Sequence, residues 1–265
     1  MKQIDIHECH NILIKIAAAF HEICMRHQIP YYMIGGTMLG AIRHNGFIPW
    51  DDDMDFAVER TYYAKLQKVL TEELPAHLKV RTLNNSNFIF TNYFKIEDNR
   101  TEICDHWHDS PLDFGISIDI FPLDKGQNSY WQTRLFATYI FSLLMIKDFL
   151  LFDIKYRRGL KKLLAIVLQK TNMVPIQKRL KYINNCIIRN AKEQSGYIVN
   201  YYGKWQNKEI MQKKIVGTPQ LYPFQNMNLA GVEHAEAYLS LLYGDYMQLP
   251  PKEERTNHLT AMKYK

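Results

Sequence analysis

The stretch from Tyr31 to Phe56 constrains this chain more than any other. It begins as an apolar segment, passes through two glycines and a threonine, and ends in four aspartates within five positions: Asp51, Asp52, Asp53 and Asp55. Carboxylates this close repel one another and raise one another's pKa unless a cation lies between them. The cluster also leads into an apolar strand rather than a polar loop, which favours a cation site over a solvated acidic turn.

The spacing of Asp53 and Asp55 indicates which cation to expect. Side chains alternate along a strand, so Asp53 and Asp55 lie on the same face. Hard oxygen ligands suit Mg²⁺, which typically takes one or two carboxylates together with substrate phosphates. We therefore expect Mg²⁺ (or Mn²⁺) as cofactor. The alternative is a solvated acidic loop, which is the usual meaning of an isolated Asp-Asp-Asp run.

The residues Gly35-Gly36-Thr37 precede the aspartates. Glycines allow the backbone to approach a ligand closely, and N–H groups at the start of a helix bind phosphate. We expect Thr37 to cap a short helix that runs through Arg43. A phosphate pocket beside a metal site is typical of phosphoryl-transfer enzymes.

A third carboxylate, Asp119, lies between Ile118 and Ile120 in a predicted strand. Burying a carboxylate among apolar residues is costly unless it is paired or bound to a cation. Asp119 is therefore the natural partner of the first two aspartates, the alternative being an ion pair with a residue such as Arg43. Asp124, at the end of the same segment, is expected to be a turn residue.

Other side chains have two interpretations each. Trp50 is either part of the core or a wall for a ligand ring or quaternary ammonium group. Lys95 is either a surface lysine of a strand or a phosphate ligand. His106 and His108 share a face if they lie on a strand, but no cysteine accompanies them, so a metal site there is the weaker alternative.

Charge is distributed unevenly along the 265 residues. Residues 1–125 carry 12 Lys/Arg and 18 Asp/Glu, residues 126–215 carry 17 and 4, and residues 216–265 carry 4 and 5. An acidic first part is thus joined to a strongly basic middle, which implies an anionic partner such as nucleic acid, a phosphorylated polymer or a membrane surface. The middle segment combines basic residues with apolar helix, as interfacial helices do, although plain helical packing also fits.

The remaining patterns concern location and fold. Four separated cysteines, the absence of a secretory leader and an apolar run of only Leu135–Ile146 predict a cytoplasmic protein. The basic middle segment would allow it to lie at the inner face of the plasma membrane. We expect an α+β fold with residues 1–125 as the catalytic core, residues 126–195 as a basic helical segment, and residues 196–265 as a segment packing back on the core. Residues 208–216 read as a short strand or an extended loop, and the tail after Asn257 is expected to fray.

Three motifs resemble those of the LicD family of phosphotransferases. They are the run from Gly35 to Asp55, the segment Ile118–Asp124, and the segment from Tyr238 to Pro251. The resemblance implies a nucleotidyltransferase-like mixed sheet. It also implies transfer of a phosphorylated alcohol, such as phosphocholine or a polyol phosphate, from a CDP-linked donor to a sugar hydroxyl of a cell-surface glycan precursor: a teichoic acid, capsule polysaccharide or lipopolysaccharide. The acceptor would be lipid-linked and CMP the leaving group.

The resemblance also assigns roles to single residues. Asp53 and Asp55 match the metal-holding pair, Asp51 the carboxylate before it, and Asp119 the third acid. The donor-phosphate corner is matched by Gly35, Gly36 and Thr37, and a basic residue near the phosphates by Arg43. The resulting hypothesis has Asp53, Asp55 and Asp119 as catalytic residues, with Trp50 and Lys95 as further substrate-binding candidates.

Two rival functions remain at this stage. The same fold could move a nucleoside monophosphate from an NTP to a small molecule or RNA and release pyrophosphate. The chain could instead be a non-catalytic nucleic-acid-binding module that uses its basic segment. The complete acidic set argues against the second function, so we expect no nucleic-acid partner.

Overall fold

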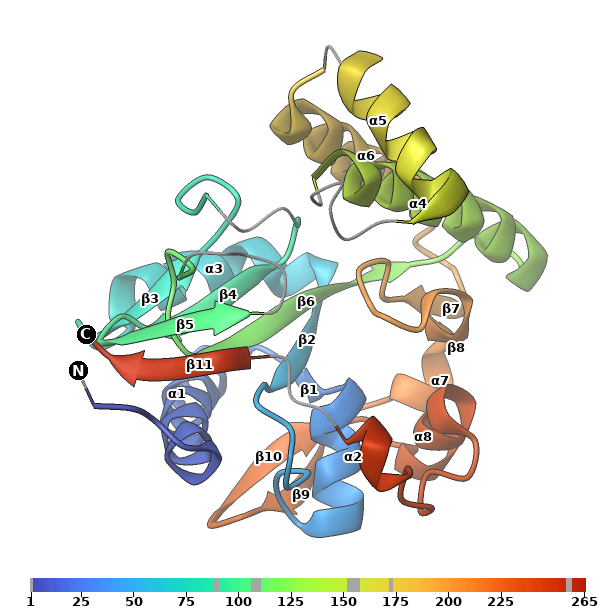
Figure 1. Ribbon diagram of the computed structural model, residues 1–265. Coiled ribbons are helices and arrows are strands. Elements are labelled where there is room, and N and C mark those ends of the chain that lie inside the picture. The colour runs from blue at the N-terminus through green and yellow to red at the C-terminus, as the bar shows by residue number, and fades with distance from the viewer. Residues whose placement is uncertain (1, 88–90, 106–110, 152–157, 172–173, 256–258) are drawn as a thin grey trace.

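The computed structural model describes residues 2–87, 91–105, 111–151, 158–171, 174–255 and 259–265 (Figure 1). Its centre is a mixed nine-stranded sheet, and the predicted α+β class is confirmed. The main path through the sheet runs in the order β3 (Leu78–Arg81), β4 (Phe94–Asp98), β6 (Ser117–Lys125), β2 (Asp55–Glu59), β1 (Tyr32–Met33), β10 (Met227–Gly231), β9 (Gln220–Phe224). The pairs β2–β6 and β1–β10 are parallel, and the other pairs on this path are antiparallel.

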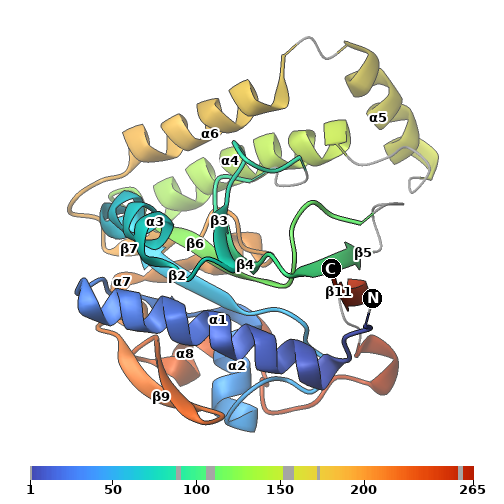
Figure 2. The same cartoon turned by 90° about the vertical axis from the view of Figure 1, so that its left-hand side faces the viewer.

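Helix α1 (Ile6–Arg26) packs against α3 (Arg60–Glu73) and against β4 and β6, and Figure 2 shows it running beside the sheet. Its apolar residues recur at helical spacing and are buried, which gives the helix one face for the core. The Asp5 side chain caps the helix by accepting a hydrogen bond from Glu8 N at 2.8 Å. The spacing of its apolar residues and the Asp5 cap together account for α1.

Helices α2 (Gly35–His44) and α8 (Ala235–Tyr243) pack together near the other end of the sheet (Figure 1). Helix α2 begins at Gly35 and not after Thr37, so the prediction that Thr37 caps this helix is wrong. The Thr37 hydroxyl instead accepts a hydrogen bond from the backbone N of Asp55 at 2.7 Å. Thr37 thus ties the start of α2 to the first residue of β2.

In the described residues, the basic middle segment forms three helices: α4 (Tyr130–Leu151), α5 (Gly159–Thr171) and α6 (Ile176–Asn190). Both views show them grouped on one side of the sheet (Figures 1 and 2). Helices α4 and α6 share a second hydrophobic cluster with β7 (Tyr197–Val199) and β8 (Ile210–Gln212), and this cluster includes Ile140, Ile187 and Tyr201. None of the helices in the described part of the chain has both the length and the apolar character that a membrane span requires.

Two other predictions concern the C-terminal part. The first is wrong: the tail does not fray at residues 259–264, because β11 (Leu259–Tyr264) pairs with β5 (Thr101–Asp105) in a two-stranded antiparallel sheet. The second is confirmed only in part, because β8 is a short strand within residues 208–216 but the rest of that segment is not extended. The 3-10 turn η2 (Gln206–Glu209) leads into β8, and the short helix α7 (Lys213–Val216) follows, while a second 3-10 turn, η3 (Lys252–Glu254), precedes β11.

Asp124 is also not the turn residue that its position suggested. It lies inside β6 opposite Val199 of β7 and is fully buried. The Arg60 guanidinium donates two hydrogen bonds to its carboxylate, Nε to Oδ1 and Nη2 to Oδ2, each at 2.7 Å. Burial raises the pKa of Asp124, and the bond to Arg60 opposes that shift.

Arg60→Met should lower the free energy of unfolding by about 3 kcal/mol, because it leaves the Asp124 carboxylate buried without its cation. The double variant Arg60→Met with Asp124→Leu should recover most of that loss, since no charge is then buried. Urea unfolding of both variants measures this, with Lys68→Met on the exposed face of α3 as the control. A double variant no more stable than Arg60→Met would show that the charge of Asp124 is not the cause.

Candidate active site

Three neighbouring strands bring two carboxylates and a lysine side by side. The parallel register of β2 and β6 places Asp55 opposite Asp119, and the antiparallel register of β6 and β4 places Asp119 opposite Lys95. The Lys95 ammonium forms an ion pair with the Asp119 carboxylate. Asp119 therefore does have an ion-pair partner, as the alternative expected, but the partner is Lys95 and not Arg43. Lys95 thus lies at the carboxylates rather than at a remote surface.

The segment before β2 supplies three more carboxylates. The ligand oxygens of Asp51, Asp52 and Asp53 lie within 4.8 Å of one another. Asp52 is buried, and its Oδ2 accepts a hydrogen bond from Leu259 N at 2.7 Å. His10 Nε2 donates to the carbonyl of Asp51 at 2.7 Å, so α1 also holds this segment in place.

The cluster has the electrostatics of a cation site. The pKa of Asp55 is raised well above its usual value, first by burial and then by the negative charges of Asp53, Asp119 and Asp51, while Lys95 opposes the shift. Hard carboxylate oxygens at such spacing fit a divalent cation, which would remove the repulsion. The residues present therefore suit Mg²⁺.

The glycine corner lies against these carboxylates. A Cβ atom added to Gly36 would lie 2.7 Å from Asp51 Oδ2, and one added to Gly35 would lie 3.2 Å from Asp55 Oδ2. Gly35 also has φ of +53°, a conformation that favours glycine. Its N–H donates to the Tyr238 hydroxyl at 2.9 Å, which joins the start of α2 to α8. The backbone at the N-terminus of α2 thus touches the acidic cluster.

One cavity of about 600 Å³ unites these features. Asp51, Asp53, Asp55 and Asp119 line it together with Gly35 and Gly36. Its lining is also rich in aromatic rings: Tyr202, Trp205 and Tyr243 from the C-terminal part of the chain, with Trp50 and Tyr93 from the first part. The arrangement offers a cation site, backbone N–H groups and aromatic surface within one enclosure of ligand size.

The remaining candidates lie in different places. Trp50 lines the cavity, and the guanidinium of Arg255 lies 4.9 Å from its ring centre. Arg43 is not among the residues that line the cavity. Its Nη1 donates to the carbonyl of Tyr246 at 2.9 Å, which fixes the turn after α8 to α2. His106 and His108 lie outside the described residues.

Sequence reasoning missed the contribution of Glu209. Its carboxyl group is buried, lines the cavity and accepts a hydrogen bond from Trp205 N at 3.1 Å. A Cβ atom at Gly203 would lie 1.8 Å from Glu209 Oε1, so this glycine makes room for the carboxyl group. Burial raises the pKa of Glu209 to about 7. No signal in the sequence separates this glutamate from a surface one.

Comparison with known proteins matches residues 28–155 to the family model described as LicD/FKTN/FKRP, nucleotidyltransferase domain. A lipopolysaccharide cholinephosphotransferase, LicD, of Haemophilus influenzae is 30% identical over 271 aligned residues, which cover 97% of this chain and 97% of that protein. An uncharacterised protein of Rickettsia typhi is 28% identical over 113 residues, covering 40% of this chain and 35% of its own length. The crystal structure of ANT(2″)-Ia in complex with adenylyl-2″-tobramycin is 10% identical, covers 67% of this chain and 98% of that chain, and has a TM-score of 0.23, too low to carry an argument.

The buried Glu209 predicts a pH dependence of stability. Its folded pKa of about 7 lies above the ordinary value of 4.5, so its favourable contribution is fully present below pH 4.5 and is lost as the pH rises to about 7. The loss amounts to about 3 kcal/mol for a shift of this size.

Glu209→Gln keeps the shape of the protonated side chain and should flatten that part of the pH–stability curve. Urea unfolding between pH 4 and pH 8 measures it, with the exposed Glu236→Gln as the control. If wild type and Glu209→Gln lose stability in parallel over this range, Glu209 is not the titrating group.

Proposed function

The chain belongs to the LicD/FKTN/FKRP family as a LicD-type phosphotransferase, and we propose that it transfers a phosphorylated alcohol from a CDP-linked donor to a sugar hydroxyl of a cell-surface glycan precursor, releasing CMP. The observation that carries this proposal is the convergence of Asp53, Asp55 and Asp119 with the Gly35-Gly36 corner in one cavity. Phosphocholine is the first candidate for the transferred group, because the Haemophilus influenzae relative is a cholinephosphotransferase.

Asp53 and Asp55 would hold Mg²⁺ (or Mn²⁺), with Asp51 and Asp119 as further ligands. When bound, the ion would neutralise charge on the transferred phosphoryl group and the leaving CMP. The fit rests on the donor set itself, a group of carboxylates in which burial and then mutual repulsion raise the pKa of Asp55.

The N-terminus of α2 would bind the donor phosphates. The first N–H groups of a helix have no partner within the helix and attract anions. Because Gly35 N already donates to the Tyr238 hydroxyl, this role passes to the next amides, Gly36 and Thr37. Tyr238 would act as a positioning residue, since it sets the direction in which this corner faces.

Asp119 would accept the proton of the attacking sugar hydroxyl. It lines the cavity and lies opposite Asp55 in the sheet, so it is next to the metal-binding pair without being part of the same strand. The Lys95 ammonium forms an ion pair with this carboxylate. That pairing would position the Asp119 oxygens and balance their charge before the hydroxyl arrives.

The aromatic wall would bind the alcohol. Trp205 and Tyr243 form an edge-to-face pair with ring centres 5.1 Å apart, and both line the same cavity as the carboxylates. Aromatic faces attract quaternary ammonium groups by about 0.5–2 kcal/mol. This chemistry favours choline over glycerol or ribitol, whose hydroxyl groups would gain nothing comparable from the rings.

A lipid-linked acceptor on the cytoplasmic side of the membrane would explain the surface of the helical segment. Helix α5 exposes Leu160, Leu163 and Val167, and its neighbours Lys161 and Lys162 are exposed as well. Basic side chains beside exposed apolar ones match an anionic bilayer surface, which binds the charges while the apolar groups enter the interface. We therefore propose peripheral membrane association through α5.

Asp53→Asn should abolish CMP release from CDP-choline in the presence of Mg²⁺ and a lipid-linked glycan acceptor, because the metal loses a ligand. Its melting temperature should stay near that of wild type, while the stabilisation that Mg²⁺ gives wild type should disappear. Asp245→Asn, on the exposed turn after α8, is the matched control.

The same assay decides the reaction class when it is run with CDP-choline, CDP-glycerol, CDP-ribitol and CTP. We expect CMP from CDP-choline and no pyrophosphate from CTP. Turnover retained by Asp53→Asn would contradict the metal role, and pyrophosphate release with nucleotide transfer would show a nucleotidyltransferase instead.

Lys161→Glu with Lys162→Glu should abolish co-sedimentation with vesicles that contain anionic lipid, because the attraction of α5 to the surface is reversed. Wild type should bind anionic vesicles and fail to bind purely zwitterionic ones. Lys68→Glu with Lys79→Glu, which changes two exposed lysines of the catalytic core, is the charge-matched control. Equal loss in both double variants would indicate a general charge effect and no specific role for α5.

A further inference from the structure

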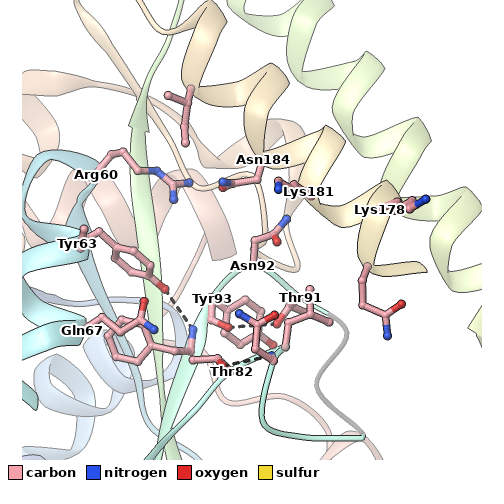
Figure 3. Close-up of a pocket in the computed structure, with 16 residues that line it drawn as sticks. Arg60, Tyr63, Gln67, Thr82, Thr91, Asn92, Tyr93, Lys178, Lys181 and Asn184 are labelled. Atoms are coloured by element: carbon pink, nitrogen blue, oxygen red, sulfur yellow. Dashed lines mark hydrogen bonds between the residues drawn. The ribbon is translucent and has the colours of Figure 1, made fainter. Parts of the chain in front are cut away.

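A second cavity, of about 610 Å³, lies between α3, the β3–β4 region and α6 (Figure 3). It is separate from the carboxylate cavity, but Tyr93 lines both. The Lys95 ammonium that pairs with Asp119 lies 5.7 Å from the centre of the Tyr93 ring. One aromatic side chain therefore divides the reaction centre from a second space of ligand size.

The lining of this second cavity has the chemistry of a carbohydrate site. Amide and hydroxyl groups provide donors and acceptors from three elements: Gln67, Thr82, Thr91, Asn92, Gln177 and Asn184. Tyr63 and Tyr93 add two aromatic rings to this lining. Among the described residues that line it, none is Asp or Glu, whereas Lys178 and Lys181 are cations (Figure 3). The site would thus favour a sugar that carries negative charge.

Asn184 supplies independent evidence for a ligand. Its Oδ1 is buried and accepts no hydrogen bond from the described residues. Figure 3 shows its side chain pointing across the cavity toward Arg60, whose guanidinium is held by the buried Asp124. Buried polar atoms in folded proteins almost always have a partner, so an acceptor left open in a cavity suits the hydroxyl group of a bound molecule.

Hydrogen bonds of Asn92 also connect the linings of the two cavities. Asn92 Nδ2 donates to the carbonyl of Leu180 in α6 at 2.9 Å and to the Tyr202 hydroxyl at 3.1 Å. Tyr202 lines the carboxylate cavity. A saccharide bound against Asn92 would therefore contact α6 and Tyr93. It would also lie beside Tyr202, which lines the carboxylate cavity.

We propose that the second cavity binds the acceptor, as an anionic saccharide whose next sugar unit reaches past Tyr93 toward Asp119. Asn184 accepts a hydrogen bond from one of its hydroxyls, and Lys178 and Lys181 bind its negative group. This inference rests on the proposed transfer to a glycan, and it adds the place where that glycan is held. It also assigns a function to the basic face of α6 that differs from the membrane contact of α5.

The test measures binding without turnover, in the full-length protein. Glucose 6-phosphate, glucose and inorganic phosphate serve as probes, followed by ligand-observed NMR with wild type, Asp53→Asn, and Lys181→Ala with Asn184→Ala. The control is Arg189→Ala with Asn185→Ala, which also removes one positive charge and one amide, from exposed positions of α6 that do not line the cavity.

Glucose 6-phosphate should bind wild type, Asp53→Asn and the control alike, and at least 10-fold more weakly to Lys181→Ala with Asn184→Ala. Glucose and phosphate alone should each bind more weakly than the sugar phosphate. Melting temperature should not fall in Asn184→Ala, because the lost oxygen has no partner within the protein. A merely structural asparagine would lower it.

Two results would overturn the inference. Unchanged binding of glucose 6-phosphate to Lys181→Ala with Asn184→Ala would place the saccharide elsewhere. If inorganic phosphate bound as tightly as glucose 6-phosphate, the cavity would be an anion site only. Failure of the transferase proposal is seen separately, as turnover that survives Asp53→Asn. In the active enzyme, the cavity variant should raise KM for the acceptor about 10-fold and leave KM for CDP-choline unchanged.

Discussion

The parallel pairing of β2 with β6 is the constraint on which the site depends. It sets Asp55 directly opposite Asp119, two carboxylates on neighbouring central strands of the sheet that would repel each other without compensation. Register in a buried sheet is set by the apolar side chains on its faces, because a slip by one residue would move every side chain of the strand to the opposite face. The isoleucines of β6 thereby determine where Asp119 points, and the core of the protein fixes the geometry of the carboxylates.

The C-terminal part of the chain completes what the first part begins. Tyr238 of α8 bonds to the first residue of α2, Leu259 bonds to the carboxylate of Asp52, and Trp205 and Tyr243 form a wall of the cavity. These contacts join residues about 200 positions apart in the chain. A fragment that ended after β6 would therefore keep the aspartates but lose the enclosure around them and the support of the glycine corner.

The sequence predicts the local features of this protein well and the long-range ones poorly. Helical spacing predicts α1, and the clustered aspartates indicate the site. Each of these two patterns is formed by residues that are close together in the sequence. The ion pair of Lys95 with Asp119, the bond between Arg60 and Asp124, and the pairing of β11 with β5 depend on strand order and register, which no short pattern encodes. Glu209 shows the same limit, since only the folded chain makes it a buried carboxyl group.

Tyr93 lines both cavities, and we propose that each cavity binds one substrate: the donor at the carboxylates and the acceptor against α6. We propose that Asp53, Asp55 and Asp119 hold one divalent cation beside the glycine corner. Anomalous diffraction from crystals grown with Mn²⁺ and CMP would locate that cation. We expect an anomalous peak at the carboxylates of Asp53 and Asp55, with the nucleotide phosphate between this peak and Gly36. Manganese bound elsewhere, with ordered CMP away from these aspartates, would contradict it.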